Sequence, residues 1–186
     1  MKNIGKCLVL SVIIRFICLN TVCAQHLTGL ELTFIGASAM HEINYNEYWA
    51  IQLKATGGCA FGGGTMTGNW HTAWYKVSAD QRCYYNIVSR MERGKNTRYN
   101  SANFFSISPY FAYLPENQLY KERVSKYACT FNWGLRRSFC NRFYFDGSIG
   151  VGPAHIEHRG WQAVMDLNLN IGFILFNEKN KSDQIS

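Results

Sequence analysis

Three residues near the C-terminal end of the chain have the types and spacing of a metal site. His155, Glu157 and His158 form a His-x-Glu-His group, which could offer two or three ligands to a metal ion. The neighbouring sequence supplies nothing else of this kind, so a solvated loop is the favoured interpretation. We therefore predict no metal ion and no cofactor.

A catalytic serine would need a histidine within hydrogen-bond reach. Ser148 and His155 are the candidate pair. In an extended strand they would stand roughly 20 Å apart, at about 3.3 Å per residue, so the sequence predicts that the protein is not an enzyme. The glycines at 57–58 and 62–64 precede neither a Lys-Ser/Thr pair nor a helix, which excludes a phosphate loop. The run 62–64 indicates a mobile loop or a strand bend.

Charged residues recur at alternate positions of otherwise apolar segments. Inside a barrel they could conduct a proton or bind a polar ligand, but buried charges must first be paired. We therefore predict a structural network of both signs in a narrow, filled lumen. Its members are Lys54, Lys76, Asp80, Arg82, Arg136, Asp146 and Asp166.

The segments that carry these charges alternate with a period of two. In one of them Met165, Leu167 and Leu169 share a face, whereas Asp166 and Asn168 share the other. Each segment has roughly the 9–11 residues of a tilted transmembrane strand, and the pattern predicts an all-β fold with its apolar face toward lipid. Six such strands are clear, at residues 49–61, 74–87, 104–114, 127–136, 143–151 and 163–176.

The start of the sheet allows two strand counts. Residues 27–35 and 37–45 could reverse near Gly36 and give eight strands, or residues 29–45 could form one bulged strand and give seven. Membrane barrels leave no open edge in lipid, and single-chain bacterial barrels have even strand numbers. We predict a single antiparallel, up-and-down, eight-stranded transmembrane β-barrel over residues 25–176. Its membrane-girdle aromatics would be Trp49, Tyr75, Tyr85, Phe111, Tyr113, Trp133, Phe143 and Phe173.

Residues 1–24 have the basic start, apolar middle and Val22-Cys23-Ala24 end of a signal peptide. Its removal takes three basic residues and leaves 16 basic and 12 acidic ones, so the net charge falls from +7 to +4. This weak charge and the export signal argue against nucleic-acid binding. The remaining cysteines could form two disulfides or serve as small lipid-facing residues; they are Cys59, Cys83, Cys129 and Cys140.

The connections between the predicted strands differ in length. Residues 44–47 and 138–141 are predicted to be tight turns at one rim. Residues 62–72, 115–125 and 155–162 are predicted to be long polar loops at the other rim, and residues 177–186 a polar tail. Residues 89–101 are long and basic yet fall on the short-turn rim, where a solvated connection is favoured over contact with anionic lipid.

Several stretches resemble a small, mostly uncharacterised family of outer-membrane β-barrel proteins of Gram-negative anaerobes. They are residues 83–87 (CYYNI), 93–97 (RGKNT), 99–104 (YNSANF), 133–137 (WGLRR), 141–145 (NRFYF), 150–152 (GVG) and 171–173 (IGF). The resemblance covers residues 74–176 and implies a location and a fold but no activity. One departure is that Phe176 is followed by ten further residues, whereas such barrels usually end on an aromatic.

The sequence therefore predicts a non-enzymatic protein of the cell outer membrane with a structural or surface-interaction role. Outer-membrane lipid is its one predicted partner. One alternative is a soluble secreted ligand-binding barrel of the lipocalin class, which would turn its apolar face inward. A second alternative is a lipid-modifying enzyme in the same kind of membrane barrel.

Overall fold

The computed structural model describes residues 25–64, 68–115 and 123–178, and its eight strands close into one barrel. Every strand pairs antiparallel with its neighbours in sequence, and β1 pairs with β8. The predicted eight-stranded, antiparallel, up-and-down barrel is thus confirmed. The strands are β1 (Gln25–Thr33), β2 (Gly36–Asn44), β3 (Trp49–Gly64), β4 (Gly68–Cys83), β5 (Asn103–Leu114), β6 (Val124–Phe139), β7 (Phe143–Ile156) and β8 (Gly160–Glu178).

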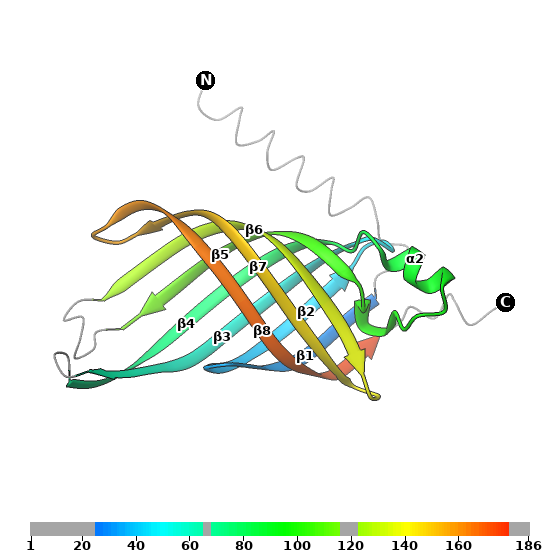
Figure 1. The fold of residues 1–186 in the computed structure, drawn as a ribbon, viewed down its shortest axis with the longest axis horizontal. Helices are drawn as coiled ribbons and strands as arrows, with labels where there is room; N and C mark the ends of the chain where they lie inside the picture. The colour runs from blue at the N-terminus through cyan, green and yellow to red at the C-terminus, as the bar shows by residue number, and fades with distance from the viewer. Residues whose placement is uncertain (1–24, 65–67, 116–122, 179–186) are drawn as a thin grey trace, which may run out of the picture.

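The two ends of the barrel differ in construction. Figure 1 shows the helix α2 (Ile87–Glu92) and both described chain ends at the right-hand end, which we call the capped end. The tight turns predicted at 44–47 and 138–141 are also present between their strands, β2–β3 and β6–β7. The β3–β4 and β7–β8 hairpins reach the left-hand end, which we call the open end (Figure 1). The predicted signal peptide at 1–24 lies outside the described residues, as do residues 179–186 of the predicted tail.

Two of the predicted long loops are largely strand. β3 continues to Gly64 and β4 begins at Gly68, so the predicted loop 62–72 is wrong, and β7 and β8 likewise take up most of 155–162. The glycine run pairs through its backbone, for example Gly62 with Trp70 and Gly64 with Gly68. Backbone pairing needs no alternation of side chains, which is why the period-two pattern did not reveal these extensions. Of the predicted loop 115–125, residues 116–122 lie outside the described part.

Side chains alternate across the barrel wall as the period-two pattern predicts. Along β6, Phe131 and Trp133 are exposed on the outside, whereas Thr130 and Asn132 are buried inside. The outer aromatics stack between strands, as Phe105 does on Phe131 with ring centroids 5.7 Å apart. Among the described residues, no helix is both long and apolar enough to cross a membrane.

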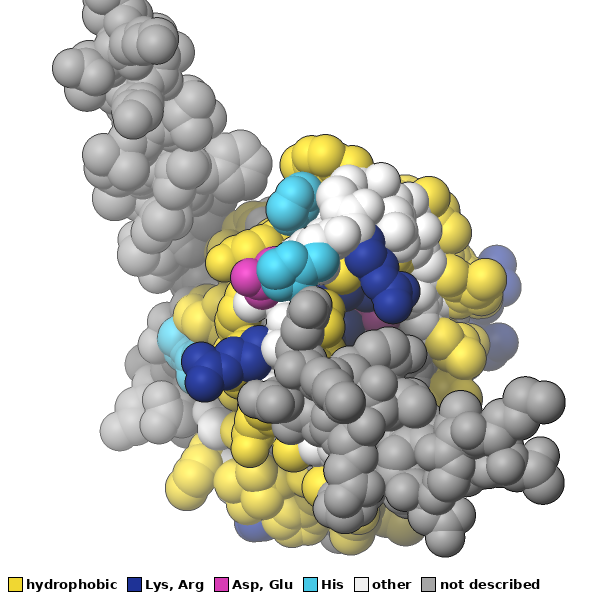
Figure 2. Space-filling view, turned by 90° about the vertical axis from the view of Figure 1, so that its left-hand side faces the viewer, with side chains coloured by type: hydrophobic (Ala, Val, Ile, Leu, Met, Phe, Trp, Pro, Cys, Tyr) yellow, Lys and Arg dark blue, Asp and Glu magenta, His cyan; other side chains and the backbone are white. Residues whose placement is uncertain are grey.

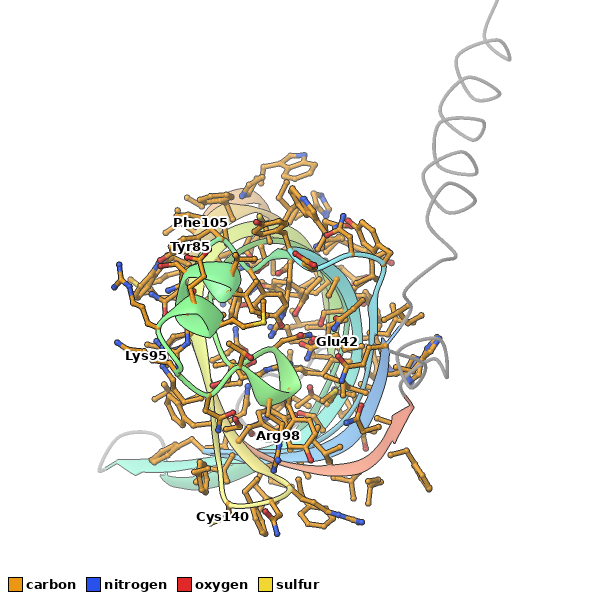
Figure 3. The ribbon with its side chains drawn as sticks, turned by 90° about the vertical axis from the view of Figure 1, so that its right-hand side faces the viewer. Glu42, Tyr85, Lys95, Arg98, Phe105 and Cys140 are labelled. Atoms are coloured by element: carbon orange, nitrogen blue, oxygen red, sulfur yellow. The ribbon has the colours of Figure 1, made fainter. Side chains whose placement is uncertain are left out.

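The segment between β4 and β5 folds over the capped end. After Cys83 the chain leaves the sheet, forms α2, and returns through the 3-10 turn η1 (Arg98–Asn100), so the predicted strand 74–87 ends four residues early. Figure 3 shows both short helices across the barrel end, with Lys95 and Arg98 on this cap. We call residues 84–102 the cap.

The inner part of the cap is buried in the barrel. Tyr99 packs among Leu27, Met40, Tyr144 and Ile174, and its hydroxyl donates to the Asn141 carbonyl at 2.7 Å. The prediction of a solvated connection at 89–101 is therefore wrong for its last three residues, Tyr99, Asn100 and Ser101. An aromatic ring gains more from filling this barrel end than from solvent contact. The structure does not test the less favoured alternative, contact of this segment with anionic lipid.

Candidate functional site in the barrel interior

A network of buried charges crosses the barrel toward the capped end. Arg136 on β6 lies at its centre, with Nη1 2.9 Å from Glu42 Oε2 and Nε 2.8 Å from Asp146 Oδ2. Arg82 on β4 reaches the same Asp146 oxygen at 2.7 Å and lies 3.6 Å from Asp80. Each arginine therefore contacts two carboxylates, which is the pairing that buried charge requires. We call Glu42, Asp80, Arg82, Arg136 and Asp146 the charge layer.

The cap covers the charge layer on the side of the capped end. Asn100 donates to Glu42 and exchanges a further hydrogen bond with Asn44 at 3.0 Å. The hydroxyl of Tyr84 donates to Glu42 at 3.1 Å, and burial raises the pKa of Tyr84, so the phenol stays protonated and remains a donor. Figure 3, which views the barrel from the capped end, shows Glu42 within the ring of strands. The described side chains thus fill this half of the lumen.

A second buried ion pair lies on the β1 side of the barrel. Lys54 Nζ is 2.6 Å from Glu31 Oε2, and the Tyr144 hydroxyl donates to Glu31 Oε1 at 2.7 Å. The Tyr144 ring occupies the space over Gly172, where a Cβ would collide with it. It also lies 4.8 Å from the Arg136 guanidinium, so it links the pair to the charge layer.

The half of the lumen toward the open end holds a cavity of about 570 Å³, to which both polar and apolar side chains contribute. This volume lies within the range of small-molecule sites, roughly 300–1,000 Å³. Lys76 Nζ contacts Asp166 at 3.0 Å, and the ammonium groups of Lys76 and Lys126 lie 4.2 Å and 5.1 Å from the Tyr110 ring centroid. Figure 2 views this end and shows basic and histidine side chains among apolar ones. We call the cavity of about 570 Å³ the outer cavity.

The structure brings the seven charged residues singled out by sequence into the same lumen. Asp80, Arg82, Arg136 and Asp146 meet in the charge layer. All of the seven except Arg136 also line the outer cavity. Glu31, Glu42 and Lys126 also lie inside and were missed. Glu31 stands between Leu30 and Leu32, which is a usable signal once the first strand is placed, whereas Glu42 and Lys126 each have an apolar or aromatic neighbour on one side only.

The eight aromatic residues predicted for the membrane girdles all project from the outer wall. Strand pairing groups them into two bands. Near the capped end, Trp49 and Phe105 lie at the same level, because both pair with Cys83 on the strand between them. Phe143 pairs with Phe173 at this end as well. Toward the open end Tyr75 pairs with Tyr113. The members of the capped-end band are Trp49, Tyr85, Trp133, Phe143 and Phe173, and those of the open-end band are Tyr75, Phe111 and Tyr113.

The remaining candidates for chemistry do not converge. Ser148 lines the outer cavity, whereas His155 is exposed outside the barrel against Trp161. His158 Nε2 lies 3.9 Å from Glu157 Oε1 in an exposed turn. Within the described ranges, no three His, Cys, Asp or Glu side chains are placed to hold a metal ion. The four cysteines Cys59, Cys83, Cys129 and Cys140 are free thiols rather than disulfides.

Comparison with protein-family models, with curated proteins and with solved structures finds no match for this chain. What the molecule can do must therefore be argued from its barrel, its charge layer and its outer cavity. These define a closed antiparallel barrel that is capped at one end and polar within.

Proposed function

We propose that the chain is a non-enzymatic outer-membrane β-barrel protein with a structural or surface-interaction role. The observation that carries this proposal is the sidedness of the wall. Outward-facing Leu167 and Val151 are 65% and 63% exposed, whereas inward-facing Arg136 and Asp146 are fully buried. Large apolar side chains cover the outer surface, which faces water in a soluble protein. Charged side chains fill the interior, which is the apolar core in a soluble protein.

The same sidedness counts against a soluble barrel of the lipocalin class. Such a barrel encloses its ligand with apolar side chains and exposes polar ones. Here the described lumen carries five acidic and five basic side chains: Glu31, Glu42, Asp80, Asp146 and Asp166, with Lys54, Lys76, Arg82, Lys126 and Arg136. An exposed apolar belt of this extent would promote aggregation in water.

The two aromatic bands give the proposed membrane position. Tyr and Trp rings favour the interface between lipid and water, and barrels carry them in girdles at both interfaces. The capped-end and open-end bands enclose aliphatic residues such as Leu53, Ile107 and Leu169, all about half exposed on the outer wall. This arrangement favours a membrane-spanning barrel whose capped end, with both described chain ends, faces the periplasm and whose open end faces the outside of the cell.

Cell fractionation tests the membrane placement directly. The protein is expected with the outer membrane, released only by detergent, and faster on a gel when unboiled than when boiled. Recovery as a soluble periplasmic or secreted protein without detergent would overturn the proposal. Retention in the inner membrane would do the same.

Thiol labelling on intact cells tests the orientation. In a chain whose four free cysteines are replaced by serine, His158→Cys places a thiol in the exposed turn at the open end. Lys95→Cys places one on the exposed part of the cap and serves as the matched control. A membrane-impermeant maleimide is expected to label the first on intact cells and the second only after permeabilisation, and the reverse result would contradict the proposed orientation.

A further inference from the structure

The β1–β2 hairpin is much shorter than its neighbours. β1 and β2 have nine residues each, whereas β3 has 16 and β8 has 19. The β1–β8 ladder therefore ends at Thr33 with Asn170, and the β2–β3 ladder ends at Gly36 with Gly58. Figure 1 shows the hairpin stopping short of the open end. In the described chain, residues 160–169 of β8 have no strand on that side, which leaves a notch in the wall.

The outer cavity extends to this notch and has an apolar margin there. Phe34 and Ile35 at the hairpin tip line the cavity on the capped-end side of the notch, and Leu167 and Leu169 line it from β8. Phe34 is 94% exposed, the highest value among the large apolar side chains of the described residues. The cavity thus has a charged interior and, at its side, a rim of the kind that contacts hydrocarbon.

Polar donors without a protein partner gather at the foot of the notch. Strand pairing places Trp74, Gly58, Gly36, Thr33 and Asn170 in one row across five strands. Among the described residues, nothing accepts from Trp74 Nε1, Thr33 Oγ1 or Asn170 Nδ2, although all three are buried.

Gly58 in the row leaves room for the indole. A Cβ on Gly58 would lie 2.8 Å from the Trp74 ring, which is closer than real side chains approach. All three groups can donate a hydrogen bond, and all three residues line the outer cavity. Buried donors are almost always paired, so this row favours a ligand rich in acceptor oxygens.

The charge near the row has the matching sign. Lys76 is paired with Asp166, but among the described carboxylates none lies within ion-pair distance of Lys126. Lys76 and Lys126 share the Tyr110 ring, so the two lysines and Asp166 leave one net positive charge at the wall. This local positive charge attracts an anion, although the ten charged side chains of the lumen sum to zero.

We propose that the notch admits a single-chain amphiphile with an anionic oxygen headgroup from the surrounding bilayer. The headgroup is held by the donor row and the two lysines, and the hydrocarbon chain leaves through the notch along Phe34, Leu167 and Leu169. This inference rests on the proposed membrane function, because the route begins in lipid. The inference assigns a class of ligand to the outer cavity, whereas the barrel fold alone indicates no ligand.

Photolabelling in nonionic detergent micelles tests the inference. The probes are palmitate with a diazirine on its chain and the matching diazirine hexadecanol, which has the same chain and no charge. Labelled peptides are mapped by mass spectrometry. Palmitate is expected to label residues 34–35 and 167–169 in preference to the rest of the outer wall, and hexadecanol is expected to label all faces about evenly.

Two matched double variants separate a specific site from a merely apolar surface. Thr33→Val with Asn170→Leu removes two of the donors, and labelling of the notch by palmitate is expected to fall by about tenfold or more, because hydrogen bonds to charged groups are strong. The control, Thr28→Val with Asn103→Leu, makes the same chemical changes away from the outer cavity and should leave the labelling pattern unchanged. Heat-modifiable gel mobility verifies that both variants fold.

Several results would overturn the inference. They are equal notch labelling by the acid and the alcohol, even labelling around the barrel, or equal labelling of the two double variants. Fractionation is scored separately. A membrane-bound barrel that labels evenly refutes the lateral route alone, whereas a chain recovered without detergent refutes the proposed function and the route with it.

Discussion

Replacing Arg136 by methionine tests whether the charge layer holds the barrel together. The change keeps much of the side-chain volume and removes the charge. In the wild type Arg136 contacts Glu42 at 2.9 Å and Asp146 at 2.8 Å. In the variant Asp146 keeps Arg82 at 2.7 Å, whereas Glu42 is left with neutral donors such as Tyr84 and Asn100.

The expected loss in the free energy of unfolding follows because Glu42 alone is left without a charged partner. Leaving one buried charge without its partner costs about 3–5 kcal/mol. At a urea dependence of about 2 kcal/mol per molar, the unfolding midpoint falls by roughly 2 M. The barrel is refolded in nonionic detergent, and unfolding is followed by tryptophan fluorescence and by the gel mobility of unboiled samples.

Two comparisons make the result decisive. Arg93→Met removes an exposed charge from the cap and should change the free energy of unfolding by less than about 0.5 kcal/mol. Adding Glu42→Gln to Arg136→Met removes the stranded carboxylate and should restore part of the loss. Equal midpoints for Arg136→Met and Arg93→Met, or no recovery in the double variant, would refute the account of the charge layer.

Three further substitutions test the wall, the interior packing and the cap. Ile107→Arg puts a charge on the outer wall and should cost about 2–4 kcal/mol in lipid vesicles, whereas Met91→Arg on exposed α2 should cost little; equal urea midpoints would contradict the lipid-facing position. Gly172→Ala places a Cβ against the Tyr144 ring and should cost about 1–3 kcal/mol through overpacking, and a wild-type melting temperature would count against that contact. Tyr99→Ala empties the cap's anchor and should speed tryptic cleavage after Lys95 and Arg98, while an unchanged cleavage rate would mean that the ring does not hold the cap.

Most of the barrel could be predicted because its wall repeats every two residues. Each strand of the second half alternates between lumen and exterior, so its face is readable from neighbours such as Phe131 and Asn132. The rule that a sheet in lipid has no open edge then settled the strand count. Strand ends were harder to predict, because the glycine run at 62–64 pairs through backbone groups that leave no pattern in sequence.

The interior site could be predicted only in part. Alternation places Arg82 and Asp146 in the lumen but does not say that both reach Arg136, since that depends on strand register. The cap was misread because its buried residues, Tyr99 and Asn100, have positive φ values and no periodicity. The notch could not be foreseen, because it arises from unequal strand lengths that become visible only after pairing.

The closure between β1 and β8 has a consequence for how the chain folds. Seven of the eight pairings join strands that follow one another, and each can form as a local hairpin. The eighth joins segments about 150 residues apart, as the hydrogen bond from Gln25 to Asn177 shows, and it contains a register shift beside Gly29. Closing a loop of this length costs conformational entropy, and no local contact between β1 and β8 offsets that cost before the two strands pair. The seam is therefore the last pairing expected to form, and until it does both edge strands are open to pairing with another chain.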